Sequence, residues 1–157
     1  MKAKHTLDRA DVEERVRAAL DTLLEQDGFL LFADVNERSI THRLAMYLQS
    51  LFPEWNVDCE YNRDGHDPKE LDLPVSGANE YDTDATTVYP DIIVHKRDSQ
   101  NNLLVIEAKK STSSRRDIQF DLVKLEQYRR QLRYEHALFV EFVTAVKPPT
   151  YHLQSIT

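Results

Sequence analysis

Three polar residues in the middle of the chain have types and a spacing that suit metal-assisted chemistry. Asp91 opens one apolar run, and Glu107 and Lys109 close the next. The residues between the runs, 98–101, read Asp-Ser-Gln-Asn, which is a series of turn formers. Two runs rich in β-branched residues on either side of such a turn predict a β-hairpin.

The predicted hairpin brings the three polar side chains together. Side chains in a strand alternate between faces, so Glu107 and Lys109 share a face, and Asp91 falls opposite them on the neighbouring strand. Two carboxylates suit Mg²⁺ (or Mn²⁺), and a nearby lysine can orient a metal-bound water or stabilise charge on a phosphate. Alternatively, Asp91 could simply open a strand and the Glu-x-Lys pair could be a solvated edge. The continuous apolar runs are typical of strands covered on both faces, which favours a site.

Pro90-Asp91, followed sixteen positions later by Glu107-Ala108-Lys109, resembles the PD-(D/E)xK nuclease motif. The resemblance implies an α/β, restriction-endonuclease-like core: a helix, a three-stranded meander, a second helix and a fourth strand, forming a mixed sheet flanked by helices. It implies that Asp91 and Glu107 bind the divalent metal, with the carbonyl oxygen of Ala108 as a further ligand. It also implies that Lys109 acts at the attacking water.

A further carboxylate is expected on the first core helix, predicted from Asp34 or Asn36 to about Phe52. In the resembled superfamily a glutamate on this helix often joins the metal site, and Glu37 matches that place. An alternative role for Glu37 is a capping box with Asp34, which lies three residues earlier. Glu60, in a strand predicted over residues 55–61, is another acidic candidate, either near the site or paired with Arg63.

The rest of the pattern predicts a single nuclease-like domain over residues 1–157, with its core at 34–143. An extra amphipathic helix is expected over residues 8–27 and ends at Gly28. A helix over 117–134 and a buried strand over 136–143 complete the core. Residues 62–87 predict a long loop, in which the His66-Asp67 pair is not expected to bind metal, and residues 147–157 predict an irregular tail.

Charge is distributed unevenly along the 157 residues, whose net charge is −7. Residues 1–90 carry 9 Lys and Arg against 19 Asp and Glu, whereas residues 91–157 carry 11 against 8. A basic half beside an acidic half is compatible with one face for phosphates. We expect four basic residues after the Glu-x-Lys segment to contact nucleic acid: Lys110, Arg115, Arg116 and Lys124.

The sequence therefore predicts a Mg²⁺-dependent nuclease, a phosphodiester hydrolase with DNA as its expected substrate. The alternative is a catalytically silent nuclease-fold module that binds nucleic acid or a protein partner in a repair or restriction assembly. A double-strand cutter would need two such sites and hence a homodimer. The sequence has no long apolar run and one cysteine, Cys59, expected in the core. We therefore expect a cytoplasmic protein with no membrane partner.

Overall fold

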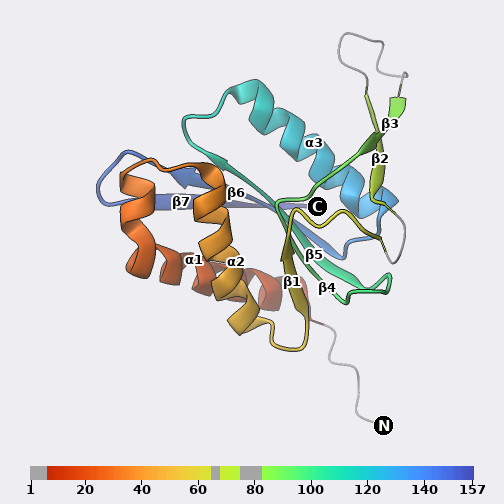
Figure 1. The fold of residues 1–157 in the computed structure, drawn as a ribbon, viewed down its shortest axis with the longest axis horizontal. Coiled ribbons are helices and arrows are strands. Elements are labelled where there is room, and N and C mark those ends of the chain that lie inside the picture. Colours follow the sequence, from red (N-terminus) through yellow and green to blue (C-terminus); the bar gives the residue numbers. More distant parts are fainter. Residues whose placement is uncertain (1–6, 65–67, 75–82) are drawn as a thin grey trace.

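The computed structural model describes residues 7–64, 68–74 and 83–157, so His66 and Asp67 lie outside the described residues. The fold is α/β (Figure 1). Its helices are α1 (Arg9–Phe32), α2 (Glu37–Leu51) and α3 (Arg115–Gln131). Its strands are β1 (Asn56–Cys59), β2 (Glu70–Pro74), β3 (Thr83–Thr87), β4 (Ile92–His95), β5 (Asn102–Lys110), β6 (His136–Val143) and β7 (Thr150–Ile156). Within the described residues, no helix combines the length and the apolar character needed to cross a membrane.

The central sheet has five strands in the order β1-β4-β5-β6-β7. β5 and β6 pair in parallel, and the other neighbours pair antiparallel, so the sheet is mixed. The parallel pair follows from the sequence order, because α3 carries the chain from the end of β5 back to the start of β6. The predicted β4–β5 hairpin and the predicted strand over residues 136–143 are both confirmed.

Helices cover both faces of the sheet, which explains the continuous apolar runs (Figure 1). α1 and α2 pack on one face, where Leu20 and Leu44 join the same buried cluster as Ile92 and Ile106. α3 packs on the other face with the β2–β3 hairpin, around Ile93 and Val105. The alternation of β4 and β5 side chains therefore feeds two separate cores.

Three sequence predictions about the elements are wrong. The N-terminal helix does not end at residue 27 but continues to Phe32 across a kink at Asp27, because Leu31 in its last turn is fully buried. The predicted loop over residues 62–87 contains the β2–β3 hairpin, and the predicted irregular tail contains β7, which pairs with β6.

Cys59 is also placed differently from the prediction. It is exposed rather than part of the core, because β1 is an edge strand of the sheet and Cys59 is its last residue. Although the residue as a whole is exposed, the surrounding protein partly shields its thiol group from water. This desolvation, reinforced by the charges of Asp58 and Glu60, raises the pKa of the Cys59 thiol to about 11. The thiol is therefore protonated at neutral pH and is a poor nucleophile.

Candidate metal centre

Asp91 and Glu107 face each other at the end of the β4–β5 hairpin. The register pairs Ile92 with Ile106, so the next residues outward, Asp91 and Glu107, fall opposite one another as the sequence predicts. Glu107 is 1% exposed, and Asp91 is partly buried. The backbone N–H of Ala108 donates a hydrogen bond of 2.8 Å to Oδ2 of Asp91, which holds that carboxylate in place.

A third carboxylate, Asp121 of α3, completes an acidic cluster that sequence analysis missed. Oxygen atoms of Asp91, Glu107 and Asp121 all lie within 4.8 Å of one another. Asp121 is 2% exposed and lies three residues after Ile118 and four before Leu125, a spacing that places all three on one face of the helix. A carboxylate at such a position must face the core, and this was the available signal.

Two lysines contact the acidic cluster. Lys109 Nζ lies 3.1 Å from Oδ2 of Asp121 and 3.8 Å from Oε1 of Glu37. Lys124 Nζ lies 3.2 Å from Oδ1 of Asp121 and 3.7 Å from Oε1 of Glu107. Burial alone would lower the pKa of each lysine, but the surrounding carboxylates outweigh it and raise both pKa values. Both side chains are therefore ammonium ions at neutral pH.

Glu37 lies in the first turn of α2 and faces the cluster through Lys109. The alternative capping box with Asp34 is wrong, because Asn36 caps the helix and accepts a hydrogen bond from the Ser39 N–H. Asp34 instead pairs with Lys110, 3.1 Å away. Burial, with the neighbouring charge of Asp91, raises the pKa of Glu37.

Tyr128 closes the buried side of the cluster. Its hydroxyl donates a hydrogen bond of 3.1 Å to Oε1 of Glu107, and the ring is fully buried. Tyr128 and Lys124 are one turn apart on α3, a spacing that places them on one face of the helix. Both reach the same carboxylate from α3, so this helix orients Glu107 through one cation and one hydroxyl.

The charges of this centre do not balance within the described residues. Four carboxylates, those of Glu37, Asp91, Glu107 and Asp121, surround two ammonium groups. Burial, followed by the charge of Asp91, raises the pKa of Glu107 well above its usual value, and burial also raises the pKa of Asp91. The excess of two negative charges matches a divalent cation, and clustered carboxylate oxygens are the ligands that Mg²⁺ and Mn²⁺ prefer.

Other expected site residues lie outside this cluster. Glu60 is exposed and pairs with Arg38 at 3.3 Å instead of joining the acidic ligands. Arg115 and Arg116 lie exposed in the first turn of α3. Of the four basic residues expected to contact nucleic acid, Lys124 therefore lies at the cluster and Lys110 is bound to Asp34, whereas the two arginines are on the surface.

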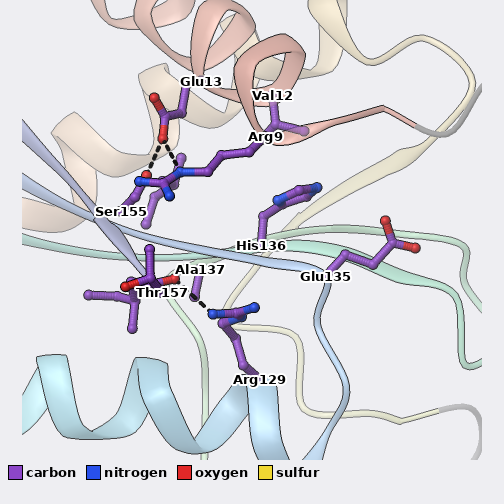
Figure 2. Close-up of a pocket in the computed structure, with 11 residues that line it drawn as sticks. Arg9, Val12, Glu13, Arg129, Glu135, His136, Ala137, Ser155 and Thr157 are labelled. Carbon is purple, nitrogen blue, oxygen red and sulfur yellow. Dashed lines mark hydrogen bonds and ion pairs between the residues drawn. The ribbon is translucent and has the colours of Figure 1, made fainter.

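A cavity of about 270 Å³ lies elsewhere, between α1, β6 and β7 (Figure 2). Several of its charged groups already have partners: Arg9 pairs with Glu13 at 3.0 Å, and Arg129 donates to the Ile156 carbonyl. His136 in its wall is paired with Leu104 of β5, three residues before Glu107, so the cavity and the acidic cluster are separate along the strands. The cavity has a mixed apolar and polar lining, and no set of metal ligands converges in its described residues.

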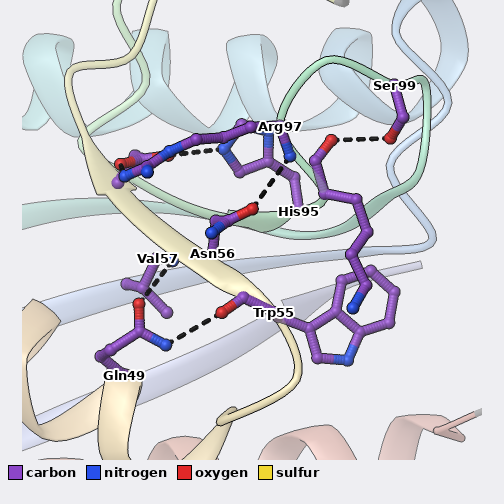
Figure 3. A network of polar contacts seen from close by, with 9 residues as sticks. Gln49, Trp55, Asn56, Val57, His95, Arg97 and Ser99 are labelled. Atoms are coloured by element: carbon purple, nitrogen blue, oxygen red, sulfur yellow. Dashed lines mark hydrogen bonds and ion pairs between the residues drawn. The ribbon is translucent and has the colours of Figure 1, made fainter.

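A second polar network lies at the opposite end of β4 from Asp91 (Figure 3). The buried ring of His95 is 2.7 Å from Asp58, and Arg97 donates two hydrogen bonds to the same carboxylate, at 2.9 and 2.5 Å. Every charge in this network is compensated by its neighbours. We therefore assign it to the pairing of β1 with β4 and not to chemistry.

Comparison with known proteins gives no match for this chain: no family model, no curated protein and no solved structure is significantly similar to it.

Proposed function

We propose that the protein is a Mg²⁺-dependent nuclease that hydrolyses phosphodiester bonds of nucleic acid, with DNA as the expected substrate. The observation that carries the proposal is the convergence of Asp91, Glu107 and Asp121 within 4.8 Å, with Lys109 at their edge. The order α2, β1, β4, β5, α3, β6 agrees with the order of elements expected from the resemblance of residues 90–109 to the PD-(D/E)xK motif, and this supports the proposal.

The three clustered carboxylates would hold the divalent ion. When bound, the ion lowers the pKa of a coordinated water and neutralises charge on the phosphate. Asp91 is held by the Ala108 N–H and Glu107 by Tyr128, so these ligands are fixed before a metal arrives. Asp121 also contacts both lysines, so two ammonium groups lie beside the proposed metal site and could stabilise the charge of a bound phosphate.

Lys109 is suited to stabilise negative charge and to orient the attacking water. Asp121 and Glu37 keep it protonated, so it is a hydrogen-bond donor and not a general base at neutral pH. An ammonium ion held by two carboxylates is already oriented, and no reorganisation is required as charge develops on the phosphate.

The test is cleavage of supercoiled plasmid, single-stranded DNA and RNA, each with Mg²⁺, Mn²⁺ or EDTA. We expect wild type to cut only with metal and Lys109→Ala to be slower by about 10²-fold or more. Lys96→Ala is a matched control, because Lys96 lies beyond the far end of β4 over the Trp55 ring. If wild type is inert and calorimetry detects neither Mg²⁺ nor Mn²⁺ binding, the proposal is wrong, and the chain is a silent nuclease-fold module.

A further inference from the structure

Two aromatic side chains stand exposed beside the acidic cluster. Tyr89 is 59% exposed and Phe120 is 48% exposed, and both belong to the few large apolar residues that the described part of the chain leaves in solvent. Tyr89 precedes Asp91 by two residues, so their Cα atoms are at most ~7.6 Å apart. Phe120 is the chain neighbour of Asp121. Each ring therefore belongs to a residue within two chain positions of a proposed metal ligand.

The segments that carry the two rings lie in the same layer of the fold. Val88, just before Tyr89, is buried in the cluster that also holds Leu125 and Tyr128 of α3, and Phe120 lies on that same helix. The backbone before Tyr89 and the helix that carries Phe120 are therefore both on the side of the sheet that α3 and the β2–β3 hairpin cover (Figure 1).

The backbone and a neighbouring lysine hold these rings near the site. Pro90 follows Tyr89 and restricts it to an extended conformation, which limits the directions that its ring can take. Phe120 and Lys124 are one helical turn apart on one flank of α3, and Lys124 Nζ lies 5.5 Å from the Phe120 ring centroid. The same ammonium group is 3.7 Å from Glu107, so the ring and the cluster share a cation.

We propose that Tyr89 and Phe120 are stacking platforms for the bases that flank the scissile phosphate, and that the substrate is single-stranded nucleic acid. The inference rests on the proposed nuclease function. An aromatic ring can stack on an unpaired base but cannot reach the face of a base inside a duplex. Lys124, between ring and cluster, would meet the phosphate of the stacked nucleotide.

The charge of the chain favours the same substrate. A net charge of −7 opposes binding of a polyanion. A duplex carries one phosphate charge per ~1.7 Å of axis, whereas a single strand carries about half that density. Stacking on aromatic rings supplies affinity without any net positive charge, and it does not depend on base sequence.

The test is fluorescence anisotropy with labelled single-stranded DNA, single-stranded RNA and duplex DNA, in Ca²⁺ instead of Mg²⁺. We expect single strands to bind more tightly than the duplex, and the DNA and RNA probes to show which sugar is preferred. Tyr89→Ala and Phe120→Ala should each weaken single-strand binding by about 5- to 150-fold, whereas Phe120→Tyr retains it. Phe29→Ala is the control, because Phe29 is 74% exposed on α1, across the sheet from α3.

A probe with abasic sites gives an independent measure of stacking. We expect wild type to lose affinity for it, and the alanine variants to lose little more, because ring and base are then both absent. Duplex binding at least as tight as single-strand binding, or alanine variants equal to the Phe29→Ala control, overturns the inference and leaves the rings to a protein partner. If cleavage depends on Lys109 but single-strand binding by Tyr89→Ala and Phe120→Ala is unchanged, only this inference is overturned. Ring-dependent binding without cleavage overturns only the proposed catalysis.

Discussion

Replacement of Asp121 by asparagine tests the metal centre at the residue with the most contacts. Its carboxylate lies 3.1 Å from Lys109 and 3.2 Å from Lys124, and within 4.8 Å of both other acidic ligands. A divalent ion ~4 Å from a carboxylate attracts it by ~8 kcal/mol at an effective dielectric constant of ~20. The asparagine carbonyl oxygen can still ligate the ion, and the remaining carboxylates and solvent also offset most of this. We expect Mn²⁺ or Mg²⁺ to bind about 10- to 100-fold more weakly.

Isothermal titration calorimetry measures this change in metal affinity directly. Asp117→Asn is the matched control, because Asp117 is an exposed aspartate one turn earlier on α3. Asp121→Asn also leaves two lysines with fewer partners, so we expect the free energy of unfolding in EDTA to fall by about 1–3 kcal/mol. Urea unfolding in EDTA separates this loss from the loss of metal affinity. Equal metal affinity in wild type, Asp117→Asn and Asp121→Asn would refute the assignment of Asp121 as a ligand.

Two further predictions concern charges outside the metal centre. Burial lowers the pKa of Lys69, which is 0% exposed and stands over the Tyr61 ring, to about 8. Below pH 8 the lysine is charged in both the folded and the unfolded state. In the folded state this charge is buried, and its desolvation lowers the free energy of unfolding. Lys69→Met should therefore raise the free energy of unfolding at pH 7 by up to ~3 kcal/mol, and this gain should shrink between pH 8 and 10.5 in urea unfolding. Burial alone would raise the pKa of Asp58, but hydrogen bonds from Arg97 and His95 outweigh it and lower that pKa. The resulting stability is present above the ordinary aspartate pKa and lost as the pH falls through the folded value. Asp58→Asn should thus cost about 1–3 kcal/mol at pH 7 and progressively less below pH 4, and a pH-independent difference in thermal or urea unfolding would contradict this.

Local patterns predicted the part of the site that lies on one hairpin. The turn at residues 98–101 sets the register of β4 and β5, and the period of two places Glu107 and Lys109 on one face. Asp91 and Glu107 could therefore be placed opposite each other from the sequence. Similarly, the apolar stripe of α3 and the strand at 136–143 were visible, because each has a clear period or a continuous apolar run.

Local sequence patterns did not predict the elements that are stabilised mainly by contacts with neighbouring elements. β7 alternates between exposed and partly buried residues and is ordered by pairing with β6, so its own sequence carries little signal. The last turn of α1 continues past Gly28 because Leu31 is buried in the core. Cys59 is exposed because β1 lies at the sheet edge. The sequence of a strand does not reveal its position in the sheet.

The sequence by itself determined the hairpin, the two carboxylates and the lysine on it, and the core helices and the strand at 136–143 around them. Only the tertiary structure decided that Asp121 is the third carboxylate of the acidic cluster, that Lys124 and Tyr128 reach Glu107, and that Glu60 pairs with Arg38. The physical reason is distance along the chain. A hairpin brings neighbours together through local backbone geometry, whereas α3 reaches the cluster only by packing its buried stripe against the sheet.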